Sequence, residues 1–185
     1  MTPTPLLRPS GPESLLVIIP ALNEAGAIAR VVQSIHEHVP GVPVLVIDDG
    51  STDDTISVAR NAGAAILPMP HHLGLGGCVQ AGYRLAHELG FDYVIRVDGD
   101  GQHDARDIPL VFERLKQSGC EMVIGSRFAD GNSYHPELVR SLGIRIFRML
   151  LRPILGRPVY DPTSGFVGVN RRALDVFSPP REEYK

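Results

Sequence analysis

The chain has 185 residues, of which 43% are hydrophobic and 21% charged, so it has the size and composition of one globular domain. Its formal net charge of −3 argues against a protein held to nucleic acid by phosphate contacts. The two cysteines are too few for a disulfide scaffold and favour a reducing, cytoplasmic location. No run approaches the ~18 apolar residues of a membrane-spanning helix.

Short apolar runs alternate with segments of helical periodicity along the chain. The apolar runs predict strands at residues 15–19, 44–47, 64–67, 93–97, 122–124 and 165–169. The periodic segments predict helices from a cap at Asn23 to Ile35, from a cap at Ser51 or Asp53 to Asn61, and at residues 74–89, 107–118 and 138–152. This order predicts an α/β fold with a mostly parallel sheet and helices on both faces. We expect residues 1–14 to be a flexible leader and residues 15–185 to form a single domain.

The loops that follow the strands are the first places to look for a site, because ligands of such sheets bind beyond the carboxyl ends of the strands. The most informative loop contains Asp98 and Asp100, which share one face of extended backbone, with glycines that permit a sharp turn. Two neighbouring carboxylates favour a cation, and with the carbonyl of Gln102 they form an oxygen ligand set suited to Mg²⁺ or Mn²⁺. The alternative is an ordinary surface turn.

Other strand ends carry polar groups that suit a nucleotide. Glu24 can hydrogen-bond a nucleobase edge, or simply lie in the first turn of a capped helix. The segment 48–53 can accept hydrogen bonds from ribose or base, or serve as a turn and cap. Arg127 suits phosphate oxygens, although a surface ion pair is an equal alternative. The glycines at 74–77 lack the dinucleotide-binding spacing, which disfavours a Rossmann oxidoreductase.

Five motifs occur in an order that resembles family 2 glycosyltransferases, whose fold is called GT-A. These motifs lie at residues 17–24, 46–53, 98–103, 124–127 and 161–166. The resemblance covers roughly residues 15–177 and is greatest to the dolichyl-phosphate mannosyltransferase-like branch. That branch transfers a sugar from a nucleotide donor to a polyprenyl phosphate.

The resemblance implies roles for the matching residues. The nucleobase contacts would come from Pro20, Leu22 and Glu24, and the nucleoside contacts from Ile47 and Asp49. The donor diphosphate and the metal would lie at Asp98, Gly99, Asp100 and Gln102, with phosphate charge also met by Arg127. The acceptor side would be formed by the motif that contains Asp161 and Ser164.

The implied reaction is a metal-dependent transfer, with inversion, from a GDP- or UDP-linked sugar. Asp100 and Asp161 are the catalytic candidates, and Asp161 would act as a general base if the acceptor were a hydroxyl. A lipid monophosphate is already mostly ionised and needs positioning more than deprotonation. The alternative functions are a non-catalytic sugar-nucleotide binder and a nucleotidyltransferase.

Residues 138–158 contain five arginines, many apolar residues and no acidic residue. This pattern is typical of a helix lying on an anionic membrane surface, and it predicts peripheral association with the inner face of the membrane. A helix packed on the sheet with solvated arginines is the alternative. Family members usually continue past the Ser-Gly-Phe strand with another helix and strand. Since this chain stops at Lys185, we expect either a donor site completed differently or a truncated form.

Overall fold

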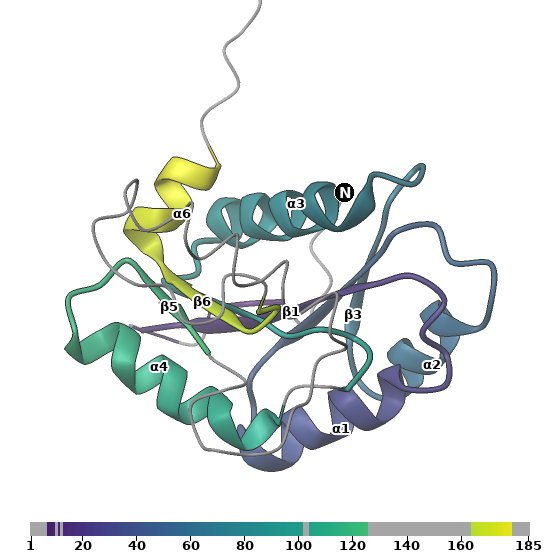
Figure 1. The fold of residues 1–185 in the computed structure, drawn as a ribbon, viewed down its shortest axis with the longest axis horizontal. Coiled ribbons are helices and arrows are strands. Elements are labelled where there is room, and N and C mark those ends of the chain that lie inside the picture. The colour runs from purple at the N-terminus through teal and green to yellow at the C-terminus, as the bar shows by residue number, and fades with distance from the viewer. Residues whose placement is uncertain (1–6, 10, 12, 102–103, 126–163, 179–185) are drawn as a thin grey trace, which may run out of the picture.

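The computed structural model describes residues 7–9, 11, 13–101, 104–125 and 164–178, which form a sheet with helices on both faces (Figure 1). The strands are β1 (Leu15–Ala21), β2 (Val44–Asp48), β3 (Ala65–Pro68), β4 (Tyr93–Arg96), β5 (Met122–Ile124) and β6 (Val167–Asn170). Their order in the sheet is β3-β2-β1-β4-β6-β5. Strands β1 to β4 pair in parallel, whereas β6 runs antiparallel to both β4 and β5. The predicted α/β fold with a mostly parallel sheet is confirmed.

The helices form two layers. They are α1 (Ile28–His38), α2 (Thr55–Asn61), α3 (Gly74–Leu89), the short 3₁₀ helix η1 (Ala105–Asp107), α4 (Ile108–Gln117) and α6 (Arg171–Phe177). Figure 1 shows α1, α2 and α4 below the sheet and α3 and α6 above it. Each layer has its own buried cluster, one built from α1, α2 and α4 and the other from α3 and α6. The sheet is therefore apolar on both sides, which explains why its strands are apolar runs rather than alternating patterns.

The central strand β1 is buried along its whole length and ends at the site. It extends two residues beyond the predicted strand and includes Pro20, which pairs in register with Ile47 of β2. The Pro20 carbonyl faces Gly99, on the side where the β4 ladder has already ended. The N–H and C=O of one strand residue point to the same side, so an N–H at position 20 would face the side on which β4 no longer pairs. Proline, which has no N–H, therefore costs the sheet no hydrogen bond at this position.

The predicted cap of the first helix was wrong. Helix α1 begins after Ala27, which makes no side-chain cap, and the first amides of the turn bond to the carbonyl of Glu24. Asn23 has left-handed backbone with φ 56, and its side chain accepts hydrogen bonds from Thr52 instead. At the second helix, the carboxylate of the predicted cap Asp53 does accept a hydrogen bond from the amide of Thr55, the first residue of α2.

Two residues of the predicted leader lie against the domain. The side chain of Leu7 is buried in the cluster on the α3 side. Ser14 is also buried, and both its amide and its hydroxyl donate to the carboxylate of Asp92. The boundaries of the leader and of the domain stay predictions.

Candidate active site

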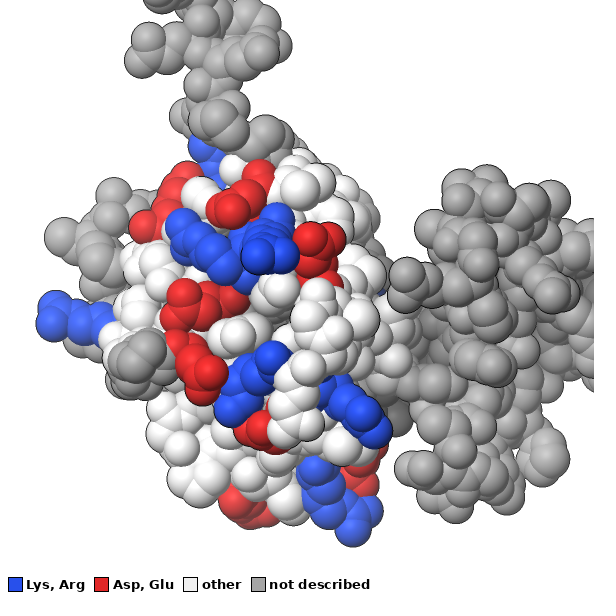
Figure 2. Space-filling view, turned by 90° about the vertical axis from the view of Figure 1, so that its left-hand side faces the viewer, with Lys and Arg blue, Asp and Glu red and all other residues white. Residues whose placement is uncertain are grey.

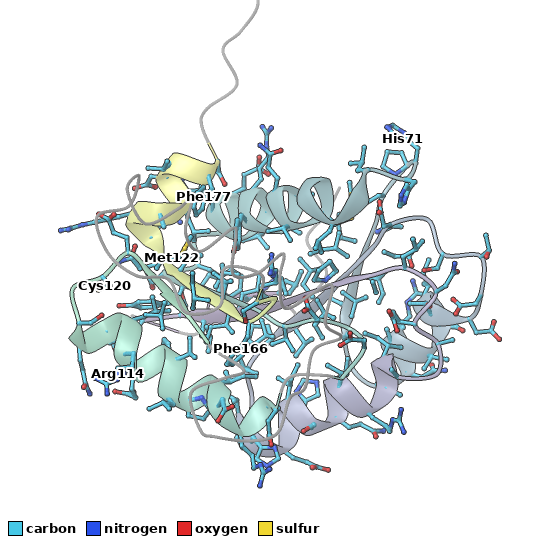
Figure 3. All side chains as sticks on the ribbon, viewed as in Figure 1. His71, Arg114, Cys120, Met122, Phe166 and Phe177 are labelled. Atoms are coloured by element: carbon cyan, nitrogen blue, oxygen red, sulfur yellow. The ribbon has the colours of Figure 1, made fainter. Side chains whose placement is uncertain are left out.

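The candidate site lies at the rim where the parallel strands end. The loops after β1, β2 and β4 reach this rim at their carboxyl ends. Because β6 is antiparallel to β4, its amino end arrives at the same rim and brings Ser164, Gly165 and Phe166 beside the acidic turn. Figure 3 shows Phe166 well inside the molecule, whereas His71 lies on an outer loop before α3. The topology thus joins segments that are far apart in the sequence.

The acidic turn after β4 packs tightly against the end of β1. Gly99 is buried, and a Cβ atom there would lie 3.3 Å from the Pro20 carbonyl oxygen and 3.6 Å from Cγ of Glu24. Gly101 adopts φ +79, a backbone conformation that glycine tolerates best. Asp100 is exposed and Asp98 is half-buried. The two glycines therefore let the turn approach β1 while both carboxylates stay at the rim.

The segment before β6 is held against this turn by Arg96, a residue that the sequence reasoning did not single out. Its Nε donates to the Gly165 carbonyl at 2.7 Å, and its Nη2 donates to the Ser164 carbonyl at 2.9 Å. The Ser164 hydroxyl donates to the Gly125 carbonyl at 2.6 Å and accepts from the amide of Phe166. Ser164 is thus buried and its hydroxyl is used within the fold, at the place predicted for the acceptor side.

A cavity of about 450 Å³ borders the acidic turn on the α1 side. It is lined by Asp100 and Gly101 of the turn, by Val97, and by residues of α1 that include Arg30 and Ser34. Space for a ligand group is therefore present next to Asp100.

Glu24 of the β1–α1 loop lies near other carboxylates. Burial raises the pKa of its carboxyl above the ordinary value, and the carboxylates of Asp100 and Asp53 raise it further. The other two residues of the predicted nucleobase stretch differ in exposure, since Pro20 is buried and the side chain of Leu22 is 41% exposed. The rim therefore carries repelling carboxylates that a bound cation would relieve.

Replacing Glu24 by Gln is expected to stabilise the metal-free protein at neutral pH. A raised pKa means that the folded state holds the proton more tightly, so Glu24 lowers stability as the pH rises from its ordinary value of 4.5 toward the folded value. We expect Tm to increase by about 1–3 °C at pH 7, and the gain to disappear below the ordinary pKa. Thermal unfolding in EDTA across this pH range measures it, with the exposed Glu121→Gln as control. An equal gain at all pH values would contradict this explanation.

The two acidic residues at the end of β2 have different partners. Asp49 is 4% exposed, and its carboxylate accepts from the amides of Leu73 at 2.7 Å and Gly74 at 2.9 Å, where α3 begins. Burial acts to raise the pKa of Asp49, but these bonds, the thiol of Cys78 and nearby His72 outweigh it, and the pKa is lowered. Asp49, predicted to bind the nucleoside, therefore caps α3.

Asp48 belongs to the predicted segment 48–53, but the sequence reasoning gave it no role of its own. Its Oδ2 accepts from the amides of Gly50 and Ser51, while its buried Oδ1 has no hydrogen-bond partner among the described residues. A buried acceptor without a donor costs roughly 1–3 kcal/mol. The predicted neighbour Ile47 is fully buried and packs toward Gly82 of α3. The only sequence signal for Asp48 was its place in the acidic pair after an apolar run.

Replacing Asp49 by Ala is expected to destabilise the protein by about 2 kcal/mol, because two amides at the start of α3 lose their acceptor. Since the lowered pKa makes the charged form favourable, this contribution exists above the ordinary value of 3.8 and is lost as the pH falls through the folded value. Chemical denaturation at pH 7 measures the loss. The matched control is Asp54→Ala, which removes an acid before α2 whose side chain makes no cap. Equal stability of the two variants would exclude the capping role.

Several predicted site residues lie outside the described residues, namely Gln102, Arg127, Asp161 and the segment 138–158. Within the described ranges, no three His, Cys, Asp or Glu side chains come together as a metal site. None of the described helices combines the length and apolar character needed to span a bilayer. Figure 2 shows the face that bears β5, α4 and α6, where acidic and basic side chains are interspersed.

Most of the chain is similar to a known protein family and to several known proteins. A family model described as glycosyl transferase family 2 matches residues 16–177. Polyprenol monophosphomannose synthase of Mycolicibacterium smegmatis is 28% identical over 176 residues, which cover 91% of this chain and 65% of the relative. Undecaprenyl-phosphate mannosyltransferase of Micrococcus luteus is 36% identical over 123 residues, which cover 63% of this chain and 49% of the relative.

A solved structure has the same fold. It is glucosyl-3-phosphoglycerate synthase from Mycobacterium tuberculosis with Mn²⁺, uridine-diphosphate-glucose and phosphoglyceric acid, similar at a TM-score of 0.70 and 27% identity. The match covers 87% of this chain and 57% of that chain. This likeness confirms the predicted GT-A fold. The present chain spans about half to two-thirds of the length of these three proteins.

Proposed function

Because this chain belongs to glycosyl transferase family 2, we propose that it transfers a sugar from a nucleoside-diphosphate sugar to a polyprenyl phosphate, with inversion at the anomeric carbon. The observation that carries the proposal is the acidic turn at Asp98 and Asp100, packed against the β1 loop that bears Glu24. The names of the mannosyltransferase relatives support the acceptor class. The donor nucleotide is GDP or UDP.

The residues of the turn fit a divalent cation. Burial and, after it, the carboxylates of Asp100 and Asp53 raise the pKa of Glu24, so negative charge gathers at this rim. Hard oxygen ligands are those that Mg²⁺ and Mn²⁺ prefer. We propose that Asp98, Asp100 and Gln102 hold this ion. When bound, it would neutralise charge on the departing nucleoside diphosphate. The neighbour with Mn²⁺ and a nucleotide sugar supports this choice.

The remaining roles are proposed from the resemblance of the motifs and, for the described residues, from their place at the rim. Glu24 and Leu22 would contact the nucleobase, and the unmet Oδ1 of Asp48 would accept a base N–H or a ribose hydroxyl. The predicted role of Asp49 becomes indirect, through its hold on α3. Arg127 would contribute a fixed positive charge to the diphosphate.

The acceptor decides whether a base is needed. A lipid monophosphate attacks as an anion, so the chain has to position it against the sugar rather than deprotonate it. A hydroxyl acceptor would need a general base, and Asp161 is the candidate. We propose that the arginine-rich segment 138–158 guides a phosphate-headed lipid at a membrane surface.

Product analysis tests the proposed function. The protein is incubated with UDP- or GDP-linked sugars, undecaprenyl phosphate and Mn²⁺, with EDTA as the matched control. We expect a glycosylated lipid phosphate and one released nucleoside diphosphate per transfer, both lost in EDTA. Release of pyrophosphate would indicate a nucleotidyltransferase, and nucleotide binding without turnover would indicate a sugar-nucleotide binder. Either result would overturn the proposal.

The membrane role has its own test. Flotation with anionic phosphatidylglycerol vesicles is expected to recover more protein than flotation with neutral phosphatidylcholine vesicles. Because the attraction is electrostatic, recovery should fall at high salt. Equal recovery with both vesicles would contradict peripheral association through the arginines.

A further inference from the structure

The loops after β1 and β2 are joined by a set of hydrogen bonds beyond the end of their strands. Three consecutive amides of the first loop donate to three side chains, two in the second loop and one on the first residue of α2. Asn23 donates to Ser51 Oγ at 2.9 Å, Glu24 to Thr55 Oγ1 at 2.8 Å, and Ala25 to Asp53 Oδ2 at 3.1 Å. We call this set, with the return bonds from Thr52 to Asn23, the loop latch.

Asn23 both donates to the latch from its backbone amide and accepts from it with its side chain. Its Oδ1 accepts from the amide of Thr52 at 2.9 Å and from the Thr52 hydroxyl at 3.3 Å. Its left-handed φ of 56 is a conformation that asparagine tolerates better than most residues. The amide and the side chain of Asn23 can therefore both face the second loop.

The latch matters because the strands themselves hold these loops only at their base. Among the described residues, the last backbone bond between the two segments runs from the Asp49 amide to the Ala21 carbonyl at 2.9 Å. Beyond it, the side-chain bonds of the latch set the distance between Glu24 and the turn that carries Asp48. We propose that Asn23 is a positioning residue that fixes this distance for the nucleoside of the donor, an inference that rests on the proposed function.

Three variants separate positioning from plain destabilisation. Asn23→Gly keeps the left-handed backbone and removes the acceptor, whereas Asn23→Asp keeps both. The matched control is Gly41→Ala, which introduces strain at φ +79 in the turn at the other end of α1, where a Cβ meets no atom within 4 Å. We expect Asn23→Gly to raise the KM of the nucleotide sugar about tenfold with kcat within about twofold. This pattern is expected when the lost interaction binds the substrate and the transition state equally well. Asn23→Asp should stay within about threefold of wild type for both constants, and Gly41→Ala should lower Tm without changing KM.

Two measurements distinguish failure of this inference from failure of the proposed function. Hydrogen exchange without ligand reads the latch directly, and we expect the amides of residues 23–25 and of Thr52 to exchange faster in Asn23→Gly than in wild type. Calorimetry with UDP and with GDP in the presence of Mn²⁺ measures the affinity of the protein for each nucleotide. Wild type that binds neither nucleotide would overturn the proposed function. Equal nucleotide affinity of wild type and Asn23→Gly, or equal exchange at Thr52, would overturn the role of Asn23 while leaving the proposed function intact.

Discussion

Asp100→Asn is expected to abolish sugar transfer while the protein remains folded. The amide has nearly the same shape as the carboxylate but lacks its charge, so the proposed cation would lose one of its anionic ligands. Loss of electrostatic stabilisation of this kind costs on the order of 10³-fold in turnover. Released nucleoside diphosphate in the presence of Mn²⁺ measures the effect. Tm in EDTA should rise slightly, because Asp100 is one of the charges that raise the pKa of Glu24.

The matched control for this variant is Asp104→Asn. Asp104 lines the same cavity as Asp100, but its carboxylate is bound to the guanidinium and amide of Arg106, which lower its pKa to about 2. We expect Asp104→Asn to retain transfer within about threefold, since a surface ion pair contributes little to the stability of the fold. If Asp100→Asn kept near-normal turnover, or if both variants lost activity equally, the metal role of Asp100 would be excluded.

The strands and the site rim could be predicted from the sequence for a physical reason. A strand buried on both faces must be a short apolar run, and β1 and β2 are such runs. Parallel strands send their carboxyl ends to one rim, so the acidic residues after them had to converge. The position of Glu24 beside the acidic turn follows from these two rules.

The direction of β6 could not be read from its residues. An apolar run has the same pattern in either direction, and only tertiary packing inserts β6 between β4 and β5. A part of that packing is the absence of a side chain at Gly168, where a Cβ would lie 2.7 Å from both Leu115 and Val111 of α4. The helix can therefore lie close to the strand, a detail that no local pattern encodes.

The different partners of Asp48 and Asp49 could not be predicted from the sequence for a similar reason. Adjacent acids after a strand look alike in the sequence, but successive strand residues point to opposite faces. One of them meets the start of α3, which lies 24 residues further along the chain. The cap at Asn23 failed likewise, because a residue suited to capping is also suited to left-handed backbone.

Gly165→Ala is expected to damage both stability and turnover, because this glycine lies directly against Asp98. A Cβ atom at Gly165 would come within 1.7 Å of Asp98 Oδ2 and 2.0 Å of its Cγ. The backbone cannot easily retreat, since Arg96 holds the carbonyls on both sides of the Gly165 amide. We expect a loss of roughly 1–3 kcal/mol in the free energy of unfolding. Displacing Asp98 by about 1 Å should also lower kcat on the order of 10²-fold.

A double variant shows which atom causes the damage. Asp98→Ala removes the carboxylate that the new methyl group meets, so Gly165→Ala/Asp98→Ala should recover most of the stability that Gly165→Ala loses, as chemical denaturation would measure. Because the two residues touch, their effects on stability should be strongly non-additive. Transfer should stay absent in the double variant, since the carboxylate itself is missing. Gly26→Ala, one residue past the loop latch, is the neutral control for stability, because a Cβ there meets no atom within 4 Å. Additive losses of stability would mean that Gly165 acts on the fold by some route other than its contact with Asp98.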